Sequence, residues 1–250
     1  METLSRKPFQ GITNIIRFNW QYYVIAFCSI ILLFTVKGFL PYYSQLTAAI
    51  VALFTLLSTV VSLIVSWYIY DYTGLYSLNW LPVLNGRSSG NIVNMHAGFD
   101  ETSAILAKKY PAAKLLVFDF YDPLRHTEVS IERARKAYPA FPATKVISTS
   151  KVPLNENSAD CICLIFSAHE IRNDEERVHF FQQLKNALRA DGQIILVEHL
   201  RDINNFVAYN IGFLHFLSKR KWMQTLTNAG LSVDKVFKLT PFVSTYILKK

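Results

Sequence analysis

Two long apolar stretches open the chain, and almost no charge interrupts them. They cover residues 18–39 and 46–70, and Lys37 is the only charged residue between Arg17 and Asp71. A helix over 18–39 that rises about 1.5 Å per residue would reach roughly 33 Å, enough to cross the hydrocarbon core of a bilayer. The pattern predicts a hairpin of transmembrane helices, and Pro41 ends the first of them.

From residue 91 onward, short apolar runs alternate with helix-like patterns. Strands are expected at 91–95, 114–119, 144–149, 159–166 and 192–199. Helices are expected between them at 101–109, 126–138 and 173–189. This alternation predicts an α/β fold with a doubly wound, mostly parallel sheet.

The pattern changes after residue 199. An aromatic and polar segment at 202–218 precedes a predicted helix at 219–229 and strand-like runs at 231–239 and 242–249. A short Thr240-Pro241 turn joins these runs and predicts a closing antiparallel hairpin. We therefore divide the chain into an amphipathic N-terminal segment (1–17), a transmembrane hairpin (18–71), a linker rich in turn residues (72–90) and an α/β domain (91–250).

Composition and charge favour a membrane surface as a partner. Of the 250 residues 51% are hydrophobic, the mean hydropathy is +0.20 and the net charge is +8. No arginine-rich tract or RNA-binding signature accompanies this charge, so we expect the lipid bilayer and no nucleic acid. Arg6, Lys7 and Arg17 precede the first span, which predicts both termini and the α/β domain in the cytoplasm.

Small residues recur along the second apolar stretch at spacings of four and three positions. They are Ala48, Ala52, Thr55, Thr59, Ser62 and Ser66. The spacing places them on one helix face, where they let another helix approach closely in lipid. The partner is either a second copy of the chain, which would give the homo-oligomer that we expect, or the first apolar stretch.

The segment 91–103 carries the first sign of chemistry. A strand-like run ends in His96-Ala97-Gly98-Phe99-Asp100, a helix follows at once, and the next strand ends on Asp119, 21 residues after Gly98. A strand, a glycine turn, a helix and then an acid about 20 residues on are typical of the nucleotide-binding half of a Rossmann-like sheet.

The whole order of landmarks resembles a class I S-adenosylmethionine (SAM)-dependent methyltransferase over residues 91–250. NIVNMHAGFD at 91–100 is similar to the first motif, and LRADGQIILVEH at 188–199 resembles the passage into the fifth strand. HAGFDETS, DFYDP, SAHEIR and EHLRD resemble a bacterial subgroup with an N-terminal membrane hairpin. The resemblance implies a Rossmann-like class I methyltransferase domain behind two transmembrane helices, SAM as the cofactor, and a place in the bacterial inner membrane.

By the same resemblance, SAM would be held by residues at the ends of the first strands. They are Asn94, His96, Ala97, Gly98, Asp100, Asp119, Phe120, Ser150 and Ser167. The chain departs from the family at several of them. An acid usually stands in the place of Asn94 and near Ser150, and glycines stand in the places of His96 and Asp100. Asp100, Glu101 or Asp160 could take over the ammonium group of SAM.

Histidines near predicted strand ends are the candidate bases. We expect His169 or His215 to deprotonate or orient the acceptor, with Glu170 and His199 beside them. Polar groups among aromatic residues in the segment 202–218 predict a pocket for a mostly apolar acceptor. The expected acceptor contacts are Arg201, Asn205, Tyr209, His215 and Phe216. We expect no metal.

The function expected from the sequence is O-methylation of an apolar, membrane-associated acceptor. A phenolic or quinone-like lipid, a polyene pigment head group or an amine lipid would fit. The alternative is a non-catalytic membrane scaffold that kept a degenerate methyltransferase fold. A nicotinamide-dependent reductase on the same fold is disfavoured because the closing hairpin at 231–249 resembles that of a methyltransferase.

Overall fold

The α/β domain is built on one mixed sheet of seven strands. The computed structural model describes residues 6–81, 89–125 and 128–250. The strand order is β3-β2-β1-β4-β5-β7-β6, and the strands are parallel except β7, which runs antiparallel to both β5 and β6. The strands are β1 (Asn91–His96), β2 (Lys114–Asp119), β3 (Lys145–Val146), β4 (Ala159–Ile165), β5 (Leu188–His199), β6 (Ser232–Thr240) and β7 (Val243–Lys249).

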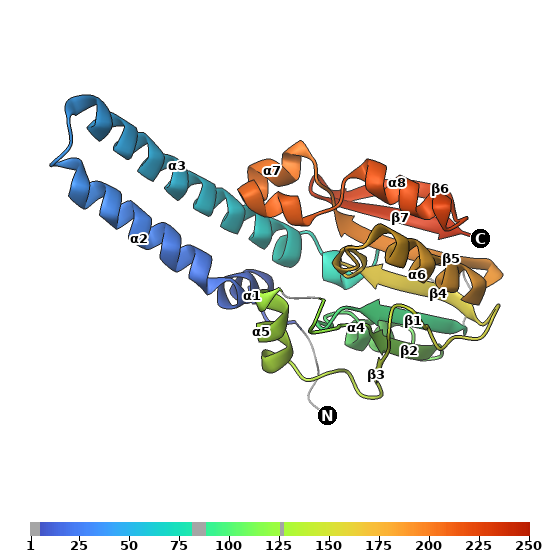
Figure 1. The fold of residues 1–250 in the computed structure, drawn as a ribbon. Helices are drawn as coiled ribbons and strands as arrows, with labels where there is room; N and C mark the ends of the chain where they lie inside the picture. The colour runs from blue at the N-terminus through green and yellow to red at the C-terminus, as the bar shows by residue number, and fades with distance from the viewer. Residues whose placement is uncertain (1–5, 82–88, 126–127) are drawn as a thin grey trace.

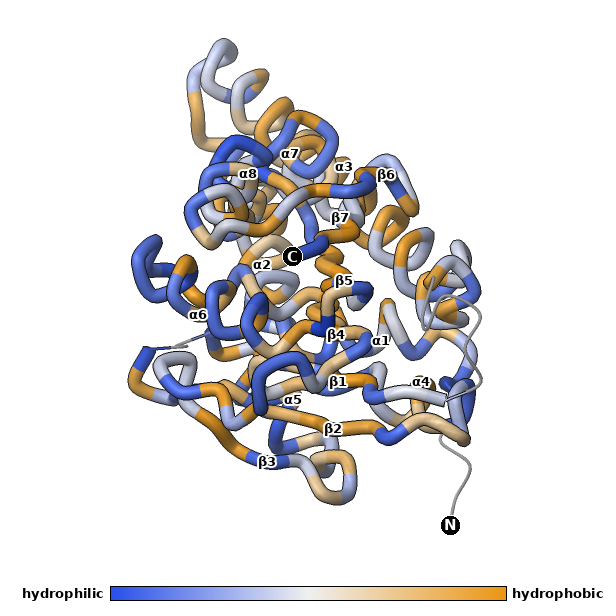
Figure 2. Tube along the Cα trace, turned by 90° about the vertical axis from the view of Figure 1, so that its right-hand side faces the viewer, coloured by the Kyte–Doolittle hydropathy of each residue, from blue (hydrophilic) through white to orange (hydrophobic). Residues whose placement is uncertain are grey.

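Both faces of the sheet are covered, which explains the continuous apolar runs of the central strands. On one face, buried residues of α6 (Asp174–Ala187) and α8 (Lys219–Asn228), such as Phe181 and Trp222, pack on Val93 and Leu196. In Figure 2 the central strands are largely orange, whereas α6 and α8 carry much blue, as expected of helices with one face in water.

The other face is covered in part by chain that precedes the sheet. Leu75, Leu78 and Leu81 are buried against this face, together with Leu106 of α4 (Ser103–Lys109). The expected linker is therefore packed into the domain up to residue 81, and its remaining part at 82–88 lies outside the described residues. The three-residue spacing of these leucines among turn residues is the sequence feature that indicates a buried segment.

A long helical hairpin projects from the domain (Figure 1). It consists of α2 (Trp20–Lys37) and α3 (Tyr42–Trp67), and α3 continues into a turn of π-helix at Tyr68–Tyr72. Both helices are long and apolar enough to cross a membrane. Ala48 and Ala52 are buried where α3 runs beside α2, so part of the small-residue face is used within the chain. The homo-oligomer stays a prediction.

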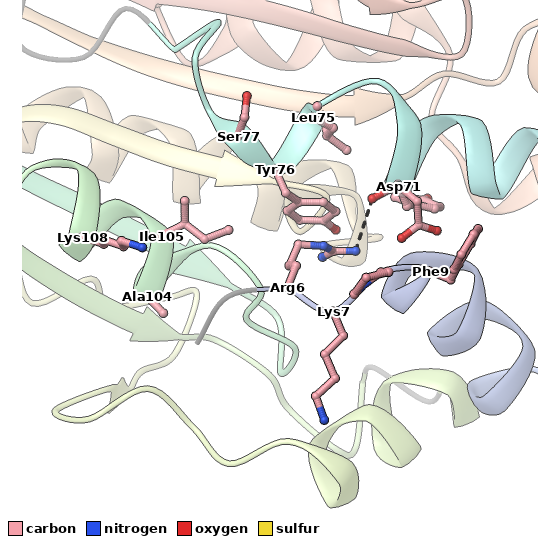
Figure 3. A pocket seen from close by; sticks show the side chains of 13 residues that line it. Arg6, Lys7, Phe9, Asp71, Leu75, Tyr76, Ser77, Ala104, Ile105 and Lys108 are labelled. Carbon is pink, nitrogen blue, oxygen red and sulfur yellow. Dashed lines mark hydrogen bonds between the residues drawn. The ribbon is translucent and has the colours of Figure 1, made fainter. Parts of the chain in front are cut away.

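The helix α1 (Gln10–Phe18) lies between the hairpin and the domain. The carboxylate of Asp71, at the end of the hairpin, accepts hydrogen bonds from the backbone of Gly11 (2.7 Å) and Ile12 (2.8 Å). It thereby satisfies two of the free amides at the N-terminus of α1. In Figure 3 the Arg6 side chain lies against the Tyr76 ring, beside a cavity of about 440 Å³.

The sequence placed most elements correctly and some boundaries wrongly. The helix after the first strand begins at Ser103 rather than 101, because Asp100 Oδ1 accepts from the backbone of Thr102 and Ser103 and holds the turn open before it. The third strand has only the residues Lys145–Val146, and β5 already begins at Leu188. The helix α5 spans Val129–Ala137; the expected start at 126 lies outside the described residues.

Candidate active site

The turn after β1 forms one end of the site. Gly98 has φ +90°, a conformation that side-chain-bearing residues rarely adopt, and its amide donates to Asp119 Oδ1 at 2.8 Å. The same oxygen accepts from the Tyr121 amide at 2.9 Å. The first strand turn and the acid after β2 are thus joined, as the sequence spacing predicts.

Buried polar atoms at this turn lack hydrogen-bond partners among the described residues. They are Asn94 Oδ1, Asp100 Oδ2 and both ring nitrogens of His96. The amide nitrogen of Asn94 is used by Thr102 Oγ1 (2.9 Å) and Ser103 Oγ (2.8 Å), so its oxygen is the free atom. A carbonyl oxygen and a carboxylate oxygen left free here suit the ammonium and sulfonium charges of SAM. This end of the site therefore fits the cofactor.

Only one of the three acids considered for the ammonium is placed to bind it. Asp160 lies at the start of β4, where it pairs with Arg189 at 2.9 Å and accepts from the Asn91 amide, at the opposite end of the strands from the turn. Glu101 is held by Arg6 at 2.6 Å and by the Tyr76 hydroxyl at 2.6 Å. Asp100 remains.

The ribose end of the site is covered by α5. Arg135 forms an ion pair with Asp119 Oδ2, and a Cβ atom on Gly98 would lie 2.9 Å from Ile131 and 3.0 Å from Arg135. Arg135 competes with the ribose hydroxyls that we expect Asp119 to bind, because it donates to Oδ2 while the Gly98 and Tyr121 amides occupy Oδ1. The Arg135 side chain is 36% exposed, so it has solvent to move into.

The other expected cofactor residues lie along the same edge. Ala97 and Phe120 are buried, and the Phe120 amide donates to His96 O at 2.9 Å while its ring packs on Phe180. Ser167, after β4, donates to Met95 O at 3.0 Å. Ser150 is exposed after β3 and shares a hydrogen bond with Ser148 at 2.8 Å. Their roles toward SAM stay predictions.

His169 and Glu198 form a buried pair across the ends of β4 and β5. Glu198 is fully buried, and its Oε2 lies 2.7 Å from His169 Nδ1 while its Oε1 accepts from the His169 amide at 3.2 Å. Burial alone would lower the pKa of His169, but the carboxylates of Glu198 and Glu170 outweigh burial and raise it to about 10. The histidine is therefore a strong base with a fixed ring orientation.

Glu170 joins His169 to His215. Its Oε1 lies 3.1 Å from Nε2 of each histidine. Burial would raise the pKa of Glu170, but hydrogen bonds with the two imidazoles hold it well below its usual range. Glu128, just before α5, lies 2.8 Å from His215 Nδ1, and this hydrogen bond lowers the pKa of Glu128.

The ring nitrogens of His199 contact neither His169 nor Glu170 in the part of the chain that the structure describes. Its Nδ1 faces Phe242 O at 3.1 Å and its Nε2 faces the Tyr70 hydroxyl at 2.8 Å. Its ring stacks between Phe166 (4.8 Å) and Phe216 (4.9 Å). Burial lowers the pKa of His199 to about 4. With both nitrogens engaged, this neutral ring is suited to docking the hairpin on the domain rather than to catalysis.

The expected acceptor residues divide into those that build the segment and those that line it. Arg201 donates to Phe216 O at 2.8 Å and to Leu214 O, and buried Asn205 donates to Phe242 O at 3.1 Å, so both hold backbone. Tyr209 is partly buried, with its hydroxyl oxygen buried beside Ser66, and burial raises its pKa. The Phe216 ring lies 6.4 Å from the His169 ring, which places it at the site.

Sequence reasoning missed the partners of the candidate base. Glu198 is not among the residues singled out from the sequence, although an acid near the end of an apolar strand signals a buried charge that needs a partner. No sequence pattern indicates that three further residues reach the site, because the placement of α5 and of the loop after β4 brings them there. They are Glu128, Arg172 and Arg135.

Comparisons with known proteins agree with this fold. Residues 84–210, just over half of the chain, match the family described as O-methyltransferase domain. No protein of curated function matches the chain in sequence.

Solved structures share the fold at low identity. An O-methyltransferase family 2 protein from Planctomyces limnophilus in complex with apigenin is 13% identical with a TM-score of 0.50, and the match covers 77% of this chain and 60% of that one. TnmH is 18% identical with a TM-score of 0.50, covering 84% and 61%. A SAM-dependent methyltransferase from Methanosarcina mazei is 14% identical with a TM-score of 0.48, covering 66% and 93%. The chain belongs to the O-methyltransferase domain family and is a SAM-dependent methyltransferase.

Proposed function

We propose that this protein is anchored in a membrane and methylates a hydroxyl group of an apolar, membrane-associated acceptor. The His169–Glu198 pair carries the proposal. A hydroxyl must lose a proton as it is methylated, so it needs a positioned base, and a histidine oriented by a buried carboxylate at 2.7 Å suits that task. Amine and carbon acceptors have less need of such a pair.

The residues of the chain divide the work. When bound, SAM supplies an electrophilic methyl group. Glu198 keeps the proton of His169 on Nδ1, so Nε2 is the atom that takes the acceptor's proton, and it lies 3.1 Å from Glu170 Oε1. An acceptor hydroxyl that replaces this contact would donate to Nε2, and the imidazolium formed would stay between two carboxylates.

The raised pKa of His169 sets the pH at which this base is free. Because that pKa is about 10, most of the enzyme holds a proton on Nε2 at neutral pH. Turnover should therefore rise as the pH increases toward 10, since a larger fraction of the protein then has the neutral imidazole.

The surface of the helical hairpin supports the membrane anchor. No residue of α2 is buried, and at about 1.5 Å per residue its 18 residues reach roughly 27 Å. Large apolar side chains stand exposed along both helices, including Ile25, Phe27, Leu32, Phe34, Leu53, Phe54 and Leu57. Such a surface is far larger than the apolar patches of soluble proteins and suits hydrocarbon.

Apolar groups between the hairpin and the base support an apolar acceptor. The rings of Phe166, Tyr209 and Phe216 gather around His199 at centroid distances of 4.8–5.6 Å, at the end of α3. An acceptor that leaves the bilayer near α3 would meet these rings before it meets His169. The relative from Planctomyces limnophilus holds apigenin, a phenolic compound, which supports a phenolic class here.

The test is methyl transfer by the full chain in lipid nanodiscs. Labelled SAM is offered with phenolic and quinol lipids, and with amine lipids as the comparison class. We expect label in a hydroxyl-bearing lipid and a loss of about 10²–10⁴-fold in turnover for His169→Gln. SAM binding without transfer to any class would favour the non-catalytic scaffold, and equal transfer by His169→Gln would exclude the base.

The orientation in the membrane has a separate test. A cysteine placed at Ser44, in the first turn of α3, should react with an impermeant thiol reagent on intact cells, while one at exposed Ser89 should not. The reverse labelling would place the domain outside the cytoplasm and would refute the proposed location.

A further inference from the structure

Three side chains that are far apart in the sequence bring one ligand atom each to a common point. These atoms are Nε2 of His169, Oε1 of Glu170 and Nε2 of His215, and the three groups converge within 4.8 Å. We propose that they form a binding site for a divalent transition-metal ion with two imidazole ligands and one carboxylate ligand. His215 stands 45 positions after Glu170, so no ligand spacing in the sequence indicated the site.

The distances suit shared coordination. Bonds of about 2.0–2.2 Å from a metal to nitrogen and oxygen ligands place adjacent ligand atoms roughly 3.0–3.5 Å apart, depending on the angle. Glu170 Oε1 lies 3.1 Å from each histidine nitrogen. An ion can thus enter with small side-chain movements and without moving a strand.

Each histidine has a carboxylate on its other ring nitrogen. Glu198 lies 2.7 Å from Nδ1 of His169, and Glu128 lies 2.8 Å from Nδ1 of His215. Metal-binding histidines almost always donate their second N–H in this way, because the contact fixes the tautomer and makes the ligand nitrogen more basic. Two such pairs that both aim Nε2 at one carboxylate oxygen are more than the base alone requires.

The charges around the point favour a cation. Three carboxylates face the cluster: Glu170 from the loop after β4, Glu198 from β5, and Glu128 from the start of α5. The guanidinium of Arg172 is a positive group at this cluster. Its Nη2 lies 2.7 Å from His215 Nε2, the proposed ligand atom, and also contacts Nδ1, while its Nη1 donates to His215 O. Arg172 is exposed, so it can leave for solvent when an ion takes over its charge.

The types of ligand atom limit which metal ions can bind at this site. Imidazole ligands favour zinc, iron, cobalt, nickel and copper over magnesium and calcium, which prefer sites made only of oxygen. Zn²⁺ is the probe of choice because it has no redox chemistry. An ion on Nε2 of His169 also removes the atom that accepts the proton, so Zn²⁺ should inhibit methyl transfer; this consequence, unlike binding itself, rests on the proposed function.

The experiment measures Zn²⁺ binding by calorimetry on the full chain in detergent, after treatment with a chelator. We expect one high-affinity ion per chain, weakened more than about 10-fold by His215→Ala and about 10-fold by Glu128→Gln. His179→Ala, on the exposed face of α6, is the matched histidine control and should bind like the unaltered chain. Arg172→Gln should bind more tightly, because it removes the competing cation.

Cobalt gives a readout that does not depend on affinity or activity. Bound Co²⁺ should show visible absorption bands that change in His215→Ala and stay the same in His179→Ala. Circular dichroism checks that each variant is folded. Binding of unchanged strength and spectrum in both His215→Ala and Arg172→Gln, or no binding to the folded chain, overturns the site. The proposed function is tested separately, by methyl transfer in the absence of metal, and the outcome of the metal-binding experiment does not decide it.

Discussion

Replacing Glu198 by glutamine should slow methyl transfer while leaving SAM binding intact. The carboxylate is fully buried and uses both oxygens on His169, at 2.7 Å to Nδ1 and 3.2 Å to the amide. A hydrogen bond to a charged group is worth about 1.5–3 kcal/mol. The imidazolium that forms during proton transfer would lose this much, which corresponds to a fall of roughly 10–100-fold in kcat at a pH where His169 is neutral in both proteins.

The variant should also move the pH profile. Glu198 is the strongest of the groups that raise the pKa of His169. Without its charge, burial counts for more and that pKa falls, so the rise in turnover should shift from near pH 10 to lower pH. The glutamine NH₂ group must face either Nδ1–H or the His169 amide, both of which are donors, so thermal stability should fall as well.

The assay separates the steps and includes a matched control. Turnover is measured with saturating SAM and acceptor from pH 6 to pH 10, and SAM affinity is measured by calorimetry. Glu175→Gln, an exposed residue of α6, makes the same change without a buried partner and should behave like the unaltered enzyme. If Glu198→Gln kept both the rate and the pH profile of the control, His169 would not be the base.

Four further predictions follow from individual residues. Arg135→Gln removes the ion pair with Asp119 and should tighten SAM binding about fivefold in calorimetry, as expected for about 1 kcal/mol from a partly exposed ion pair. Weaker binding would mean that Arg135 itself holds SAM. Asp119→Ala should weaken SAM binding by roughly 10–100-fold. Tyr70→Phe leaves Nε2 of buried His199 without its 2.8 Å partner and should cost about 1–3 kcal/mol of stability in thermal unfolding, and an unchanged Tm would contradict the docking role. The pKa of His199 is lowered to about 4 in the folded chain, below an unfolded value of about 6.5, so its contribution to stability should be lost as the pH falls through this interval, which denaturant titration at pH 7 and pH 5 measures.

The sequence was sufficient for features that depend on local pattern. Apolar runs of strand length, each followed by a helix, required a parallel sheet covered on both faces, and the structure has that sheet. The glycine turn and Asp119 could be paired from their spacing because a βαβ unit brings the ends of neighbouring strands together. The pair of long apolar helices could also be predicted, because only one charged residue interrupts the 53 residues between Arg17 and Asp71.

Tertiary structure alone decided which histidine has which environment. His169 lies shortly after β4 and His199 is the last residue of β5, yet Glu198 turns toward His169 across the β4–β5 ladder. His199 points to the other side, where the end of the hairpin supplies the Tyr70 hydroxyl. Successive residues of a strand face opposite sides, so Glu198 and His199 had to part, but only the packing of the hairpin fixed what each would meet.

The sequence also could not show what covers the site. The contacts of α5, Arg135 to Asp119 and Glu128 to His215, join groups separated in the chain by 16 and by more than 80 positions. Such contacts depend on where a helix docks, and the periodicity of α5 fixes only which of its faces is apolar. Local pattern therefore determined the strands, the glycine turn and the apolar hairpin, whereas the charge balance around His169 arose from chain segments that meet only in the folded protein.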